Sequence, residues 1–138
     1  MKYVQIRTKK EPNLVIEDIK QKAHEFDFII REIYDMTRQF ARHGVDVEEG
    51  FEYYSIMICN PKKAYKSISS NKMRGAVLLP PKQIIVYRDK NETVVSYIAH
   101  EEKDVKELLP DDTQFQKGLS ESCNRIASMI KEINKGVK

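Results

Sequence analysis

The segment that decides the fold spans residues 115–133 and reads FQKGLSESCNRIASMIKEI. Its apolar residues recur every three or four positions, which is the spacing of one face of an α-helix. They are Phe115, Leu119, Cys123, Ile126, Ile130 and Ile133. From Asp112 onward we therefore predict a helix of about five turns, which is long enough to lie across a whole sheet.

Three upstream stretches indicate the sheet that this helix covers. Residues 51–59 are mostly aromatic and β-branched, with Ile56 and Ile58 on one face, and predict a central strand. Residues 84–87 and 94–98 flank a polar turn and predict a hairpin. The hairpin and the long helix both need one apolar sheet face. We therefore predict a two-layer α+β fold, in which a mostly antiparallel sheet carries the long C-terminal helix on one face.

The residues before position 50 predict a strand, a helix, a second strand and a short second helix. In order, these segments are residues 4–6, 12–26, 28–34 and 35–44. In the short helix, Asp35 is the expected N-cap and Gly44 is the expected stop. Met36, Phe40 and Ala41 are expected to face inward.

Residues 60–81 predict a helix followed by an extended connection. Asn60 is the expected N-cap, and Pro61 takes the first helical position, where its missing N–H costs nothing. The predicted buried side of this helix consists of Ala64, Tyr65 and Ile68. The stretch Leu78-Leu79-Pro80-Pro81 then favours extended backbone leading into the hairpin.

The composition is that of a water-soluble globule. Hydrophobic residues make up 41% of the 138 positions and charged residues 33%, which is too apolar for a disordered chain and too charged for a membrane protein. No linker or repeat interrupts the chain, so we predict a single domain over residues 1–138. Residues 1–7 lack the apolar stretch of a signal peptide. We therefore expect a cytoplasmic protein with no membrane association, in which Cys59 and Cys123 are thiols and not a bridge.

Charge is unevenly distributed along the chain. Residues 60–88 contain seven basic residues and no acidic one, whereas residues 101–112 contain six acids against two lysines. Such segments permit a symmetric homodimer in which cationic and anionic patches meet. The net charge of +3 is too mild to indicate a nucleic-acid binder.

A weak RNA binder that uses the basic 60–88 segment is one alternative function. Tyrosines near that segment could stack on unpaired bases. They are Tyr53, Tyr54, Tyr65, Tyr87 and Tyr97. Such tyrosines more often pack a sheet with their hydroxyl groups at its rim, so we do not expect nucleic acid as the main partner.

Cys59 is the candidate nucleophile. Its thiol would lie at a strand end, directly before a helix whose dipole and whose Lys62 and Lys63 favour the thiolate. This pattern indicates a second alternative, a thiol-dependent redox or sulfur-transfer protein. Unbridged cysteine is more often a small apolar residue in a core, and we prefer that interpretation.

The same helix start has free N–H groups and basic neighbours, so it could hold a small anionic ligand such as a phosphate or a carboxylate. Solvated lysines on a helix face are the more ordinary explanation. We favour a non-enzymatic ligand- or partner-binding protein over an enzyme, with its site on the adjoining sheet and loop surface. The predicted ligand-binding residues are Cys59, Asn60, Pro61, Lys62, Lys63, Leu79 and Pro80.

Catalytic and metal-binding motifs do not occur in the sequence. It contains no nucleophile elbow, Walker loop, dinucleotide fingerprint or metalloprotease motif. His24, His43 and His100 have no metal-ligand spacing. A lone histidine can bind a haem iron, but no residue pattern here indicates haem. We therefore predict no metal site and no cofactor.

Three pieces of the sequence recur together in one known family. They are a helix with a β-rich run at residues 16–33, the strand end YSIMICNP at residues 54–61, and Leu78-Leu79-Pro80 leading into residues 85–87. In this order, over about residues 1 to 100, they resemble domain of unknown function 302, a family of small bacterial and archaeal proteins. The resemblance implies a sheet gripping a long helix, a homodimer and no established activity. Some relatives carry a cysteine after the Leu-Pro, where this chain has Pro81, and that difference weakens a two-thiol mechanism.

Overall fold

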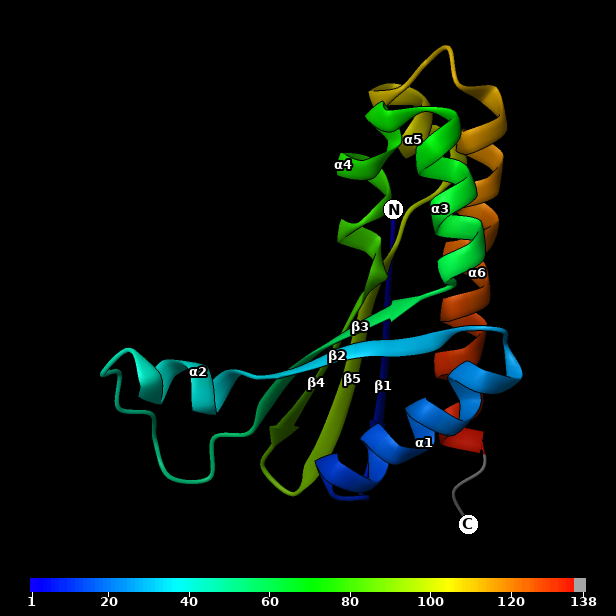
Figure 1. The fold of residues 1–138 in the computed structure, drawn as a ribbon. Helices are drawn as coiled ribbons and strands as arrows, with labels where there is room; N and C mark the ends of the chain where they lie inside the picture. The colour runs from blue at the N-terminus through cyan, green and yellow to red at the C-terminus, as the bar shows by residue number, and fades with distance from the viewer. Residues whose placement is uncertain (136–138) are drawn as a thin grey trace.

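The chain forms a five-stranded sheet in which every neighbouring pair of strands is antiparallel. The strands are β1 (Lys2–Thr8), β2 (Ile29–Asp35), β3 (Tyr53–Cys59), β4 (Gln83–Asp89) and β5 (Glu92–Ala99). Their order in the sheet is β1-β5-β4-β3-β2, so β3 is an interior strand and β4 is the middle one (Figure 1). The computed structural model describes the backbone of residues 1–135 and the side chains of residues 1–133, and residues 136–138 of the predicted domain lie outside the described residues.

Helices connect the strands and follow the last one. They are α1 (Pro12–Glu25), α2 (Met36–Arg42), α3 (Pro61–Ser70), α4 (Gly75–Leu78), α5 (Glu102–Leu108) and α6 (Thr113–Lys135), with 3-10 turns η1 (Lys72–Arg74) and η2 (Pro80–Lys82). The predicted strands, hairpin and helices all form. Helix α6 spans 23 residues and is longer than the predicted five turns. Helix α5 occupies the acidic segment, for which no element was predicted.

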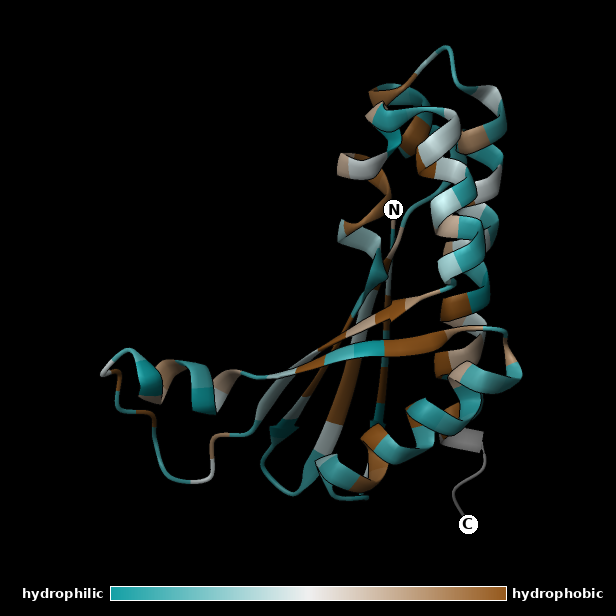
Figure 2. Cartoon of the chain, viewed as in Figure 1, coloured by the Kyte–Doolittle hydropathy of each residue, from teal (hydrophilic) through white to brown (hydrophobic). Residues whose placement is uncertain are grey.

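The hydrophobic core lies between one face of the sheet and helices α1 and α6. Helix α6 crosses β1 and β5, while α1 lies against β4 and β2. The predicted stripe on α6 is buried along its whole length, and so are Ile56, Ile58 and Val86 on the strands. Figure 2 shows hydrophobic residues concentrated along β2 and β3, while α1 is mostly hydrophilic with hydrophobic residues at intervals. The α+β fold with its long C-terminal helix on one sheet face is confirmed.

The opposite face of the sheet carries a row of aromatic rings that leads to α2. Tyr53 and Tyr87 are paired across β3 and β4, and their rings stack with centroids 5.2 Å apart. Phe51 stacks on Tyr53 at 5.9 Å, and Phe40 of α2 is tilted against Phe51 at 6.2 Å. These rings join the sheet to the α2 segment.

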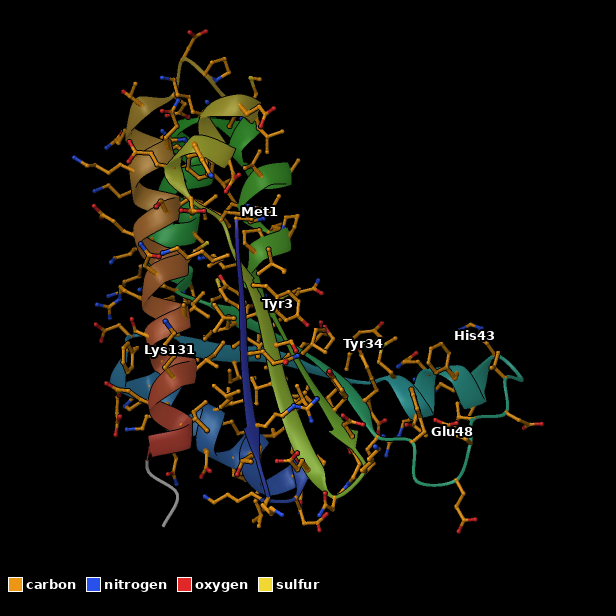
Figure 3. The ribbon with its side chains drawn as sticks, turned by 180° about the vertical axis from the view of Figure 1, so that it is seen from behind. Met1, Tyr3, Tyr34, His43, Glu48 and Lys131 are labelled. Atoms are coloured by element: carbon orange, nitrogen blue, oxygen red, sulfur yellow. The ribbon has the colours of Figure 1, made fainter. Side chains whose placement is uncertain are left out.

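Helix α2 and the loop after it extend away from the rest of the molecule as an arm, which we define as residues 36–52 (Figures 1 and 3). The predicted N-cap is confirmed, because the backbone N–H of Arg38 donates to the Asp35 carboxylate at 3.3 Å. The predicted inward face is wrong, since α2 has no buried residue and Ala41 is exposed. The arm projects beyond the core, so Phe40 finds only the aromatic row to pack against.

Two predictions for residues 60–81 are also wrong. Tyr65 is 75% exposed because α3 stands beside α6 and turns this side chain to solvent. Residues 78–81 form helical turns and not an extended connection, with Leu79 at φ −71°, ψ −44°. Buried Leu78 anchors the first turn, and the prolines suit a helical start because their φ is already near the helical value.

Candidate functional site

The candidate site is a cavity of about 350 Å³ between α3 and α6. Figure 1 shows these two helices side by side. The rings of Phe26, Phe28 and Phe115 contribute to its wall, as does Gly118 of α6. A cavity of this size with aromatic walls suits a small organic molecule.

The start of α3 is tied to one end of this cavity by Asn60. The backbone N–H of Lys63 donates to Asn60 Oδ1 at 3.2 Å, so Asn60 caps the helix as predicted. Asn60 Nδ2 also donates to the carbonyl oxygen of Asp27 at 3.1 Å. Asp27 has φ 64°, a left-handed turn that places Phe26 and Phe28 on either side of it. One asparagine therefore positions both the helix start and the aromatic wall.

Lys82 is the most unusual residue of the cavity wall. It is the last residue of the 3-10 turn that contains the two prolines, and it is only 6% exposed. Its Nζ donates a hydrogen bond to Ser122 Oγ at 2.7 Å and lies 5.8 Å from the centre of the Phe28 ring. Among the described residues, no carboxylate comes within salt-bridge distance of this ammonium.

The pKa of the Lys82 ammonium is lowered from its usual value, and burial is the main cause. The thiols of Cys123 and Cys59 act against that shift, and the neighbouring ammonium of Lys63 reinforces it. Lys82 and Lys63 are thus two cationic groups close enough to repel each other beside the same cavity.

Arg74 is a second buried cation on the cavity wall, but its charge is matched. Its Nε and Nη2 donate to the two oxygens of Asp112 at 2.7 and 2.8 Å, and Nη1 donates to the carbonyl oxygen of Ser67 at 3.2 Å. These bonds hold the pKa of the Asp112 carboxyl at about 2, well below its usual range. Asp112 also accepts from the backbone N–H of Phe115, so it caps α6.

The remaining charges around the cavity are mostly basic. Its charged lining residues are Asp27, Lys63, Lys66, Arg74, Lys82, Glu121 and Arg125. Arg125 donates to the carbonyl oxygen of Phe26 at 2.7 Å and lies 3.8 Å from the Asp27 carboxylate. Basic groups therefore outnumber acidic ones in the lining, and such a charge balance favours anions over cations.

The structure brings only some of the predicted ligand-binding residues to the cavity. Asn60 and Lys63 line it, whereas Pro61, Lys62, Leu79 and Pro80 are exposed outside its lining. Cys59, the candidate nucleophile, is a free thiol and only 7% exposed.

Sequence reasoning missed Lys82, Ser122 and Phe28. Lys82 did give a signal, because it is a single charge between two prolines and an apolar strand. Ser122 gave none, because its contact with Lys82 joins residues that are 40 positions apart.

The tyrosines proposed to stack on RNA do not form one surface. Tyr97 is buried, and its hydroxyl donates to the carbonyl oxygen of Pro81 at 2.6 Å. Tyr54 belongs to the helix-covered face, whereas Tyr53 and Tyr87 belong to the opposite face. A strand of unpaired bases cannot reach all of them at once.

Comparisons with known proteins agree with this fold. The family described as "Domain of unknown function DUF302" matches residues 4–134. The chain belongs to the DUF302 family. The match covers the acidic segment and nearly all of α6, so it extends the resemblance seen in the first 100 residues.

A solved structure shares the DUF302 fold: the crystal structure of an uncharacterized conserved DUF302 protein from Bacillus stearothermophilus. Its TM-score is 0.76 at 17% sequence identity, and the alignment covers 95% of this chain and 97% of that one. A search of the curated proteins found no match. Within the described part of the DUF302 chain, no helix has the length and apolar character to cross a bilayer, and no cluster of three or more potential metal ligands occurs.

Proposed function

We propose that this DUF302 protein is a non-enzymatic binding protein for a small amphipathic anion, held in the cavity between α3 and α6. Lys82 carries the proposal. An ammonium group that is removed from water without a counter-charge costs several kcal/mol, and an anionic ligand supplies the missing charge. Arg74, in the same wall, has a carboxylate partner within the chain, whereas none of the described residues supplies one to Lys82.

The rest of the wall supports a ligand with an apolar body. Phe26, Phe28 and Phe115 offer aromatic surface, and Leu78 and Leu119 add aliphatic surface. A fully solvated inorganic ion would leave this surface unused. An organic acid or phosphate ester with a ring or a short chain uses both the charge and the rings.

Fluorescence titration with 8-anilinonaphthalene-1-sulfonate tests this proposal, because that probe joins an aromatic body to a sulfonate. We expect saturable binding at one site per chain. N-phenyl-1-naphthylamine has the same body without the sulfonate and should bind about tenfold more weakly or worse, a difference of at least 1.4 kcal/mol. Equal affinity for the two probes, or no saturable binding, would contradict the proposal.

Two adjacent lysines of α3 provide a matched pair of variants. Lys63 lines the cavity, whereas Lys62 does not, and both are exposed. Lys63→Gln should weaken sulfonate binding severalfold, and Lys62→Gln should leave it unchanged. A similar loss in both variants would indicate attraction to general positive charge and not to the cavity.

Thiol chemistry at Cys59 has less physical support. A redox or sulfur-transfer thiol must meet its partner, and Cys59 is buried and, unlike Lys82, does not line the cavity. Slow labelling of the native protein by a thiol reagent is therefore expected. We keep the cytoplasm as the proposed location, because both cysteines are free thiols.

RNA binding through residues 60–88 also has less support. Arg74 and Arg88 are engaged by acids of the same chain, and Lys82 is buried, so these three charges are not available to a phosphate backbone. The acidic and basic segments already meet within one chain through Arg74 and Asp112. Arg74 and Asp112 are therefore not available for the contact between cationic and anionic patches of two copies that the sequence permits.

We further propose that two copies of the chain associate through the outer edge of β2. This strand ends the sheet, and its Ile29 and Tyr34 are 48% and 46% exposed. A groove of about 390 Å³ runs between β2 and α1. An exposed edge with apolar side chains favours pairing with another strand.

Charge complementarity supports a second copy as the occupant of this edge. If β2 pairs with its own copy about a two-fold axis between residues 31 and 32, Arg31 faces Glu32 twice and Ile29 faces Tyr34 twice. Light scattering at low and high salt tests the association. A dimer mass supports it, and a monomer mass under both conditions overturns it.

A further inference from the structure

We propose that Lys82 bonds covalently to its ligand, because its ε-amine is placed to condense with the aldehyde or keto group of an anionic carbonyl compound and form an imine. This inference rests on the proposed anion site and names the chemical class of its ligand. The ligand then has two functional groups, a carbonyl for Lys82 and an acid for the basic groups at the rim of the cavity.

The condensation requires the neutral amine, and the uncompensated ammonium of Lys82 gives up its proton more readily than a solvated lysine does. Burial lowers the pKa of its ammonium, and no carboxylate of the described residues holds the proton on it. Lysines that are desolvated in apolar pockets form imines for this reason. Among the described residues, Lys82 is also the only buried lysine.

The reaction balances without an oxidant or a reductant. The lone pair of Nζ attacks the carbonyl carbon, and the carbonyl oxygen takes a proton to give a carbinolamine. The nitrogen loses a proton, the hydroxyl group leaves as water, and a carbon–nitrogen double bond forms. Ser122 Oγ accepts a hydrogen bond from Nζ at 2.7 Å, so its hydroxyl can relay a proton from this nitrogen to the carbinolamine oxygen, which then leaves as water.

The other basic residues of the cavity and Lys82 bind different groups of the ligand. Lys63 and Arg125 line the same cavity and can bind the acid group of the ligand. The Phe28 ring, 5.8 Å from Nζ, lies beside the position where an imine would form. A carbonyl compound without an acid group cannot make the contact with Lys63 and Arg125. An acid without a carbonyl group cannot form the imine with Lys82.

Pyridoxal 5′-phosphate is a suitable probe because it combines an aldehyde, a phosphate and an aromatic ring. The protein is incubated with the probe at pH 7, reduced with sodium borohydride, digested and mapped by mass spectrometry. Borohydride converts an imine into a secondary amine that survives digestion. We expect the adduct at Lys82 to be at least about tenfold more abundant than that at any other lysine.

Variants and a second probe separate this inference from the proposed anion site. Lys82→Met keeps an unbranched apolar side chain at the buried position and should lose the adduct, while Lys62→Met should keep it. Pyridoxine 5′-phosphate has an alcohol in place of the aldehyde and should bind reversibly without being trapped. The circular dichroism spectrum and melting temperature of each variant establish that it is folded.

Each result has a definite meaning. Binding of pyridoxine 5′-phosphate with no excess of adduct at Lys82 overturns the imine and leaves the anion site standing. Failure of both phosphates to bind overturns both proposals. Adducts distributed among exposed lysines, with no preference for Lys82 in the wild-type chain, also overturn the imine.

Discussion

At the scale of single residues, Arg74 and Lys82 show two solutions to the burial of a cation. Arg74 donates a bidentate pair of hydrogen bonds to Asp112, and this carboxylate also caps α6. Of the described residues, Lys82 has the hydroxyl of Ser122 and the nearby Phe28 ring as its polar and aromatic partners. The first arrangement is complete within the chain and therefore stabilises the fold. The second leaves a charge unmatched, which is why we assign it to a ligand.

Asp112→Asn should destabilise the protein at neutral pH. The substitution preserves the shape and leaves Arg74 without a counter-charge, which is expected to lower the free energy of unfolding by roughly 2 kcal/mol. Urea unfolding at pH 7 measures it. The control is Glu17→Gln, which removes an exposed pair with Lys20 and should change stability by less than about 0.5 kcal/mol.

The effect of Asp112→Asn on stability should also depend on pH. The folded pKa of Asp112 is about 2, below the unfolded value, so its stabilising contribution is present above about pH 4 and is lost as pH falls toward 2. The stability difference between wild type and Asp112→Asn should therefore shrink between pH 4 and pH 2. A difference that stays constant over this range would show that the carboxylate charge is not what stabilises the fold.

At the scale of elements, helices α6 and α2 are stabilised by different interactions. Helix α6 is stabilised by the buried stripe that crosses β1 and β5, whereas α2 has no buried residue and depends on its cap and the aromatic row. Glycines occur in both settings. Gly118 lies inside α6, and Gly44 follows α2 with φ 73°.

The same substitution at these two glycines should have opposite effects. A Cβ at either position meets no atom within 4 Å, so only the backbone decides the outcome. Gly118→Ala should raise the free energy of unfolding by about 0.5–1 kcal/mol, because glycine is a poor helix former. Gly44→Ala should lower it by about 1 kcal/mol, because alanine disfavours positive φ. Thermal unfolding of both variants measures the signs, and equal signs would contradict this account.

At the scale of the whole molecule, the core accounts for one sheet face and the helices packed on it, and it leaves the edge of β2 uncovered. This edge presents apolar side chains and the neighbouring charges Arg31 and Glu32, both exposed. The two-fold pairing proposed for two copies makes these charges meet across the axis. It can therefore be tested by exchanging them.

Reversal of one charge should weaken the dimer, and exchange of both should restore it. Arg31→Glu places two glutamates opposite each other at two symmetric positions, and Glu32→Arg places two arginines there, so each single variant should associate roughly tenfold more weakly. The double variant Arg31→Glu/Glu32→Arg recreates the opposite charges. Light scattering over a concentration series measures the association, and a double variant as weak as the single ones would exclude this register.

By itself, the sequence determined the elements that have a periodic pattern. The stripe from Phe115 to Ile133, the strand before Asn60 and the hairpin each follow from local spacing, because a helix or strand repeats its environment at a fixed interval. The caps at Asp35 and Asn60 follow from local hydrogen bonds, which also depend on neighbours in sequence.

Only the tertiary structure decided which side of an element meets another element. The sequence cannot show that α3 stands beside α6, so it could not place Tyr65 in solvent or assemble the cavity. The burial of Lys82 depends on the contact with Ser122, 40 positions away, and no local pattern encodes such a distance. The candidate site depends on burial and on charge pairing, and contacts between distant parts of the chain determine both.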